Sequence, residues 1–77
     1  MKHFLEFVVR SLVDNPDDVQ ISEASKDGET IFRISLHPAD VGLVIGKGGR
    51  TISAIRDVIN AANKAGTHLS VEVVENT

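Results

Sequence analysis

Val44-Ile45-Gly46-Lys47-Gly48-Gly49-Arg50 is the stretch that decides the fold of this chain. Two glycines with G-x-x-G spacing follow an aliphatic pair, with a lysine between them and an arginine behind them. A glycine-rich backbone at the start of a helix offers free N–H groups to phosphate. We therefore expect this turn to contact a phosphate-bearing ligand. The alternative is a plain helix–helix corner with Gly46 as the C-cap, which needs one glycine and not three in four.

Apolar residues on both sides of the turn predict helices. Ile52, Ile55, Ile59 and Ala62 follow i, i+3, i+7 and i+10, which indicates a core-facing helix over about residues 49–65. Lys64 is in the last turn of that helix, where a positive charge interacts favourably with the helix dipole. Gly66 follows the helix, at the position of a left-handed cap residue. A shorter helix over about 39–45 comes before the turn, after the break at His37-Pro38. The turn is thus expected to join two helices.

The remaining segments predict one more helix and three strands. A helical stripe covers residues 3–13, and it ends at Asp14-Asn15-Pro16; its members are Phe4, Leu5, Val8 and Leu12, with Phe7 and Val9 at the edges. Apolar and polar residues alternate in three segments, which are Val19–Ser22, Phe32–Leu36 and Leu69–Val73. We expect the last residues, 75–77, to fray.

The connections between these elements predict the sheet. Lys26-Asp27-Gly28-Glu29 has the Asp-Gly pair of a tight hairpin, so the first two strands are expected to be antiparallel. The two helices between the second and third strands form a crossover, which joins parallel strands. The expected fold is α+β, in the order α-β-β-α-α-β, with a three-stranded mixed sheet and three helices on one face.

Composition and charge limit the function. The chain has 77 residues, no cysteine and a net charge of −3. It contains no apolar run long enough for a signal peptide or a membrane span, so we expect a cytoplasmic protein that does not enter a membrane. Residues 41–65 hold four basic residues against one acid, whereas the rest holds four against ten. Positive charge therefore gathers around the glycine turn, which favours local binding of nucleic acid.

Other functional classes fit poorly. A P-loop needs four residues between its glycines, but Gly42 and Gly46 are separated by three. A dinucleotide fingerprint needs glycine where Thr51 stands. His3, His37 and His68 lack metal-ligand spacing, so no metal or other cofactor is expected. We find no catalytic constellation, and we interpret Asp17-Asp18 as a solvated loop. There is no Trp or Tyr, and the three Phe fall on or beside core stripes, which disfavours recognition by exposed aromatic stacking.

The segment Asp40-Val41-Gly42-Leu43-Val44-Ile45-Gly46-Lys47-Gly48-Gly49-Arg50-Thr51-Ile52-Ser53-Ala54-Ile55-Arg56 resembles the I-G-x-x-G signature of type II KH domains. Together with the order of elements, the likeness covers residues 1–77, so we expect a single KH domain over these residues. In length and in its N-terminus the chain is similar to the small bacterial single-KH RNA-binding proteins of the KhpA type. The resemblance implies a non-enzymatic RNA-binding protein that clamps short single-stranded RNA.

The resemblance also implies roles for individual residues. Gly46-Lys47-Gly48-Gly49 would approach the sugar-phosphate backbone of about four nucleotides. Lys47 and Arg50 would supply charge, while Gly42 and Ile45 would line the groove for the bases. Gly42 is equally explained by close helix packing, and Ile45 by the core. The expected RNA-binding set is Gly42, Ile45, Gly46, Lys47, Gly48, Gly49 and Arg50. Gly48 departs from the family pattern, since it leaves only one charged side chain inside the turn.

The family implies an RNA-chaperone or post-transcriptional role linked to cell elongation and envelope homeostasis, with a second KH-containing protein of the KhpB type as partner. A domain this small contacts few nucleotides, so self-association would raise avidity. Ala54, Val58 and Ala61 lie partly outside the isoleucine stripe, and they either form a homodimer surface or complete the core. The alternative function is a KH-fold protein-interaction module with little RNA affinity of its own, which the acidic remainder of the chain favours.

Overall fold

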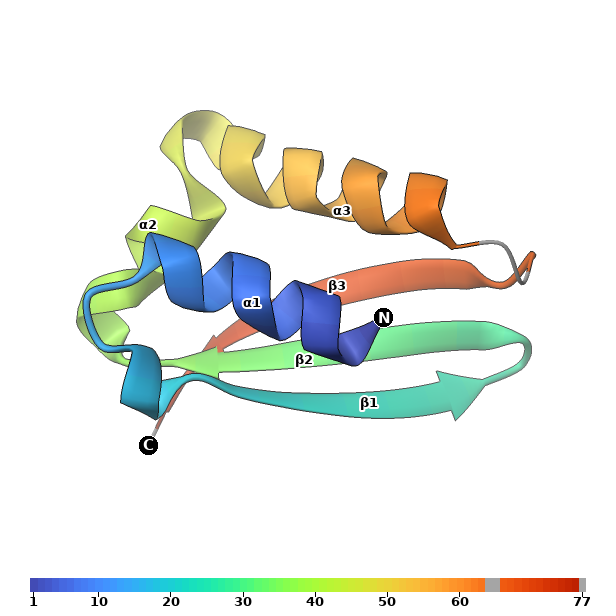
Figure 1. Cartoon of the computed structure of the whole chain (residues 1–77), viewed down its shortest axis with the longest axis horizontal. Helices are drawn as coiled ribbons and strands as arrows, with labels where there is room; N and C mark the ends of the chain where they lie inside the picture. The colour runs from blue at the N-terminus through green and yellow to red at the C-terminus, as the bar shows by residue number, and fades with distance from the viewer. Residues whose placement is uncertain (64–65, 77) are drawn as a thin grey trace.

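The computed structural model describes residues 1–63 and 66–76. Three α-helices and three strands follow the expected order, with short 3₁₀ turns between them (Figure 1). The elements are α1 (Lys2–Leu12), η1 (Pro16–Asp18), β1 (Gln20–Lys26), β2 (Glu29–Leu36), η2 (Pro38–Asp40), α2 (Val41–Ile45), η3 (Lys47–Gly49), α3 (Arg50–Ala62) and β3 (His68–Glu75).

The sheet has the predicted mixed topology. β2 is the central strand, antiparallel to β1 and parallel to β3. Ile34 shows the register, since it pairs with Ile21 on β1 and with Val73 on β3. At the hairpin Asp27 and Gly28 both have positive φ, of 53° and 78°, as a two-residue Asp-Gly turn requires. The helices lie on one side of this sheet, and α2 turns into α3 at one end of it (Figure 1).

The core lies between the sheet and the three helices. Alternate residues of the strands supply one wall, because successive strand side chains point to opposite faces. The stripe predicted on α3 supplies the other wall. The most deeply buried apolar side chains, each at most 1% exposed, are Leu5, Val9, Phe32, Ile34, Leu36, Val44 and Ile59. Ile52 and Ile55 are also buried, which confirms the isoleucine part of the stripe. Ala62, predicted on the same stripe, is exposed, because it is the last residue of the helix.

The stripe predicted on α1 is rotated in the structure. Leu5 and Val9 are its buried residues, whereas Phe4, Phe7 and Leu12 are 42%, 70% and 39% exposed. The expectation that every Phe lies on or beside a core stripe is therefore wrong for the two on α1. The covered row of α1 is Leu5 and Val9, and Val8 of the predicted stripe is partly buried against the core.

Both C-terminal predictions need correction. The long helix ends at Ala62, where Asn63 takes an extended conformation, and not near residue 65. The expected dipole contact of Lys64 lies outside the described residues, and Gly66 has a positive φ of 77° beyond the helix end. Glu75 belongs to β3, and Asn76 is held by its N–H to the Leu36 carbonyl at 2.7 Å. Position 77 is outside the described residues.

Asp40 is a buried carboxylate that the sequence patterns did not single out. It is 1% exposed at the start of α2 and joins that helix to the loop after α1. Its Oδ2 accepts hydrogen bonds from the N–H of Asn15 at 2.9 Å and from Asn15 Nδ2 at 3.2 Å, and its Oδ1 accepts from the N–H of Asp14 at 3.3 Å. Burial alone raises the pKa of Asp40, but these hydrogen bonds and the nearby His37 outweigh it and lower the pKa. The ionised carboxylate therefore fastens α1 to the start of α2.

Candidate nucleic-acid interface

The glycine turn joins α2 to α3, as predicted, and its backbone depends on glycine. Gly46, Gly48 and Gly49 have φ values of 76°, 65° and 79°. A single left-handed C-cap would need only one such residue. The turn is therefore more than a helix cap, because the 3₁₀ segment η3 separates the end of α2 from the start of α3.

Gly46 is constrained by space as well as by φ. Its φ and ψ of 76° and 171° fall in a region that only glycine occupies readily. A Cβ on this residue would overlap the side chain of Thr51, with Thr51 Oγ1 nearest, and would come within 2.9 Å of the Thr51 backbone nitrogen. The first residues of α3 thus pack directly against the end of α2, and this contact fixes the orientation of the turn.

The turn leaves backbone donors available. Three N–H groups already donate hydrogen bonds within the turn. Gly46 donates to the Gly42 carbonyl, Gly49 to the Gly46 carbonyl and Arg50 to the Lys47 carbonyl. The N–H groups of Lys47 and Gly48 make no hydrogen bond with the described protein. The sequence predicts free donors at the start of α3; the structure shows that Arg50, the first residue of α3, already donates within the turn, and that Lys47 and Gly48 of the turn itself have free N–H groups.

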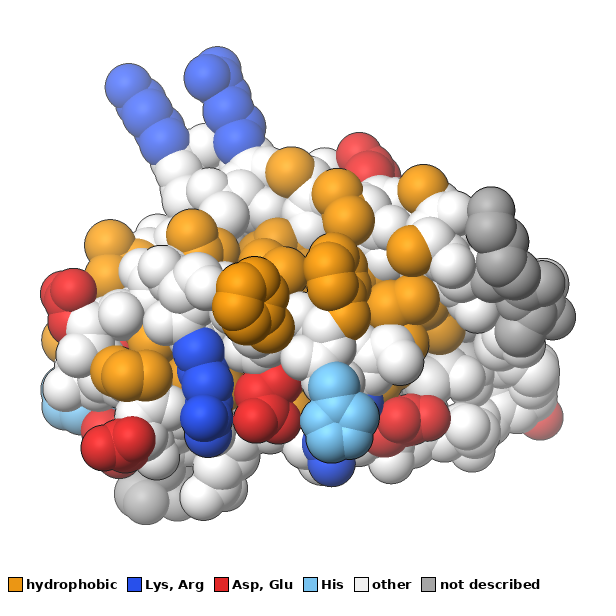
Figure 2. Space-filling view, viewed as in Figure 1, with side chains coloured by type: hydrophobic (Ala, Val, Ile, Leu, Met, Phe, Trp, Pro, Cys, Tyr) orange, Lys and Arg blue, Asp and Glu red, His pale blue; other side chains and the backbone are white. Residues whose placement is uncertain are grey.

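Two exposed cations flank these donors. The side chains of Lys47 and Arg50 are exposed, and neither forms an ion pair within residues 1–63 and 66–76. Figure 2 shows basic side chains projecting into solvent from the end of the molecule where α2 meets α3. Gly48 and Gly49 have no side chain here, and a Cβ on either would meet nothing within 4 Å. A ligand can therefore approach the backbone between the two charges.

Gly42 and Ile45 occupy the helix before the turn. A Cβ added at Gly42 would meet nothing within 4 Å, so the interpretation of this glycine as a close-packing residue is wrong. The residue is exposed, and it opens a bare patch of backbone on α2. Ile45 is half-buried against the core, so it belongs partly to the core and partly to the surface. The structure thus places all seven predicted residues within the short segment from α2 to the first residue of α3.

One contact at the far end of α3 gives no signal in the sequence. Asn60 on α3 binds the backbone of β3: its Oδ1 accepts from the N–H of Leu69, and its Nδ2 donates to the Leu69 carbonyl, both at 3.0 Å. A polar residue in the last turn of a helix gives no signal of such a clamp.

Of the two alternatives for Ala54, Val58 and Ala61, the structure excludes completion of the core, because all three residues are exposed. An apolar groove between α1 and α3 is lined by Phe4, Val8, Leu12, Thr51, Ala54, Ile55, Val58 and Ile59.

Among the described residues, no cluster of three or more His, Cys, Asp or Glu side chains is arranged to hold a metal ion. No helix within the described ranges has both the length and the apolar character needed to cross a membrane.

Comparison with known proteins agrees with this geometry. The family model described as "KhpA/KhpB, KH domain" matches residues 2–73. The RNA-binding protein KhpA of Clostridium acetobutylicum is 45% identical over 75 residues, covering 96% of this chain and 100% of the relative. The proteins of the same name from Halalkalibacterium halodurans and Chlamydia pneumoniae are 47% identical over 62 residues and 38% identical over 76, covering 82% and 97% of their own lengths. With its α-β-β-α-α-β order and its glycine turn between two helices, the chain belongs to the KhpA/KhpB family of type II KH domains.

Proposed function

We propose that this protein is a non-enzymatic RNA-binding protein that holds a short single strand at the turn Gly46–Gly49. The observation that carries the proposal is the side-chain-free backbone between two exposed cations without ion-pair partners among the described residues, Lys47 and Arg50. Phosphate contacts of this kind give binding that is sequence-tolerant and sensitive to salt. The names of the KhpA relatives, RNA-binding proteins, support the same ligand.

In this proposal the seven predicted residues have different roles in RNA binding. The N–H groups of Lys47 and Gly48 hydrogen-bond phosphate oxygens, and the side chains of Lys47 and Arg50 supply the counter-charge. The half-buried side chain of Ile45 offers an apolar surface beside the turn, and the missing side chain at Gly42 leaves room for a base to lie there. Single-stranded RNA suits this arrangement because its bases are unstacked and can be splayed apart, whereas those of a duplex cannot.

The test is fluorescence anisotropy with a random single-stranded RNA pool over a salt series. The wild-type protein is compared with the double variant Lys47→Asp, Gly48→Asp. Asp tolerates the left-handed conformation of Gly48 better than most residues, and circular dichroism checks the fold. We expect the variant to lose most of its affinity, and the slope of log K against log salt to fall by about 0.7 for each phosphate that the variant no longer neutralises.

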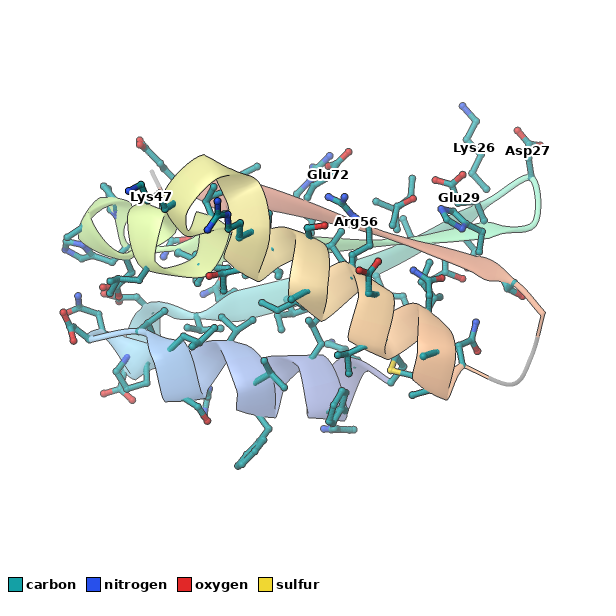
Figure 3. The ribbon with its side chains drawn as sticks, turned by 90° about the horizontal axis from the view of Figure 1, so that it is seen from above. Lys26, Asp27, Glu29, Lys47, Arg56 and Glu72 are labelled. Carbon is teal, nitrogen blue, oxygen red and sulfur yellow. The ribbon has the colours of Figure 1, made fainter. Side chains whose placement is uncertain are left out.

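The hairpin offers a matched control. Lys26→Asp with Gly28→Asp makes the same two substitutions and the same change in net charge, again at a glycine with positive φ and open space. Figure 3 shows Lys26 at the hairpin end of the molecule and Lys47 at the other end. We expect this control to bind RNA much more tightly than the turn variant. Equal losses in both variants would show that net charge, and not the turn, governs binding.

We also propose that the protein forms a homodimer through the groove between α1 and α3. Phe4, Leu12 and Val58 are 42%, 39% and 50% exposed in this groove, and Figure 2 shows hydrophobic side chains gathered over these two helices. Exposed apolar patches of this kind mark interaction surfaces. Two linked domains would double the number of turns that one RNA can meet, which raises avidity. Sedimentation over a concentration series tests this, with Val58→Asp expected to give a monomer.

The same apolar groove favours the alternative function, a protein-interaction module. Its partner would be a second KH-containing RNA-binding protein of the KhpB type, docked on the exposed apolar side chains of this groove. In this proposal the complex works in the cytoplasm as an RNA chaperone or post-transcriptional regulator in cell elongation and envelope homeostasis. Co-purification from cells with the wild-type protein, Val58→Asp and the turn variant separates the two functions. Loss of the partner only with Val58→Asp indicates that protein contact is independent of RNA.

A further inference from the structure

β1 is an edge strand with an open side. It pairs only with β2, and Figure 1 shows no described element beyond it. The hairpin is closed by Lys26 and Glu29, and the closing pair of a two-residue turn exchanges both of its hydrogen bonds. Because the bonding direction alternates along an antiparallel strand, Ile21, Glu23 and Ser25 turn their N–H and C=O groups away from β2. No backbone hydrogen bond joins these groups to another described element. The edge therefore offers a row of donors and acceptors to an extended chain.

The side chains along this edge are acidic. Residues 16–28 carry four acids and one lysine, and all four acids are exposed and without ion-pair partners among the described residues. These acids are Asp17, Asp18, Glu23 and Asp27. Glu23 lies opposite the buried Phe32 in the register, so it is on the core side of the sheet and yet exposed. An inward-pointing charge on an edge strand disfavours pairing with an apolar strand, so this edge favours a basic one.

A polar cavity lies at the start of β1. Its walls come from η1, β1, β2 and the end of β3, and the lining residues are Asp18, Gln20, Ser35, Glu75 and Asn76. Gln20 and Ser35 are register partners on the outer face of the sheet, since their neighbours Ile21 and Ile34 point into the core. Asn76 Nδ2 donates to the Asp18 carbonyl at 2.8 Å and so closes one side of the cavity. With two carboxylates in its wall, the cavity suits the charged end of a lysine or arginine side chain.

We propose that a partner protein adds an extended basic segment to the β1 edge as a fourth strand of the sheet. The backbone of this segment bonds Ile21, Glu23 and Ser25. Neighbouring strands lie about 4.8 Å apart, and every second side chain of the added strand falls on the outer face. A lysine or arginine there reaches the cavity between Asp18 and Glu75. In Figure 1 the glycine turn lies at the top and β1 at the bottom, and no cavity residue lines the apolar groove, so this docking does not depend on RNA binding.

The charge of the edge argues against two other occupants. Antiparallel pairing with a second copy over the whole of β1 places Glu23 opposite Glu23, and like charges directly opposite each other destabilise a sheet. RNA is repelled, because its phosphates meet the same unpaired acids. A basic peptide satisfies both the backbone groups and the charge.

The experiment is an NMR titration of the full chain with a capped heptapeptide of alternating lysine and valine. The control peptide has glutamate in place of lysine. We expect the basic peptide to shift the amide signals of Ile21, Glu23 and Ser25, and to slow their hydrogen exchange about tenfold when about nine-tenths of the protein is bound. The amides of Ser22 and Ala24, which already face β2, should change less. The acidic peptide should leave the spectrum unchanged.

Two variants test the backbone and the charge separately. Ser25→Pro removes an outward N–H without removing a bond to β2, and it should weaken peptide binding; circular dichroism checks its fold. Asp18→Asn should weaken binding about fivefold, and it keeps the test decisive if the proline variant does not fold. Asp57→Asn makes the same substitution at an exposed position on α3 and should bind the peptide as the wild-type protein does.

Four results would overturn the proposal. Neither peptide binds, or both bind equally. The shifts gather at Phe4 and Val58 in the apolar groove and not along β1. Asp57→Asn weakens binding as much as Asp18→Asn does, so that net charge alone governs it. Finally, protection of the Glu23 amide that rises with protein concentration, without any peptide, would assign the edge to a second copy.

Discussion

Replacing Gly46 with alanine should destabilise the protein more than any other single alanine in the glycine turn. The backbone there, with φ of 76° and ψ of 171°, costs a residue with a Cβ about 1–3 kcal/mol. The new methyl group would also lie 2.7 Å from Thr51 Cβ and 2.9 Å from the Thr51 nitrogen, and overpacking of this kind costs about 1–3 kcal/mol. Together the expected loss is roughly 2–6 kcal/mol. A chain of 77 residues has about 4–12 kcal/mol of stability in all.

Urea unfolding followed by far-ultraviolet circular dichroism measures this loss, because the chain has no Trp or Tyr for fluorescence. Gly48→Ala is the matched control, since Gly48 also has positive φ but open space around it, and it should lose only about 1–2 kcal/mol. Adding Thr51→Ala to Gly46→Ala should recover about 1 kcal/mol, because the overlap with the threonine hydroxyl disappears. If Gly46→Ala is no less stable than Gly48→Ala, the close contact between the turn and α3 is refuted.

Three further predictions concern the residues around the turn. Asn60→Ala should cost about 1–3 kcal/mol in urea unfolding, because it leaves the N–H and C=O groups of Leu69 without their partner; a loss below about 0.5 kcal/mol would contradict the clamp. The lowered pKa of Asp40 means that its ionised form favours the folded state above about pH 4, and that this contribution disappears as the pH falls through the folded-state pKa. The urea midpoint should therefore fall in acid for the wild-type protein and fall less for Asp40→Asn. Gly42→Ala should raise stability by up to about 1 kcal/mol, since its methyl group meets only solvent and helix propensity improves. The same variant should weaken RNA binding in the anisotropy assay, and unchanged affinity would remove Gly42 from the proposed interface.

Local patterns were enough to predict the three α-helices and three strands of the described residues and the position of the glycine turn, but not the short 3₁₀ segments. The Asp-Gly hairpin, the isoleucine stripe of α3 and the alternation in β2 each follow from a few neighbouring residues. The parallel pairing of β2 with β3 follows from the two-helix crossover. These features are set by backbone conformations and by periodicity, which act over a single element or a single connection.

The candidate site was predictable only in part. The chain positions of Gly46–Gly49 identify the turn, but the contact of Gly46 with Thr51 and the open space at Gly42 depend on how α2 and α3 meet. The face of α1 was misjudged for a similar reason. Periodicity marks Phe4 and Leu12 as apolar, yet it does not say which apolar row the sheet covers.

The sequence by itself determined the order of elements, the mixed sheet, the glycine turn between two helices and the concentration of basic residues around that turn. Only the tertiary structure decided which side chains meet across long separations in the chain. Asp40 binds Asn15 and Asp14, and Asn60 joins α3 to Leu69. The physical reason is that a helical or strand period specifies which residues share a face, whereas burial and hydrogen bonding depend on the element that packs against that face.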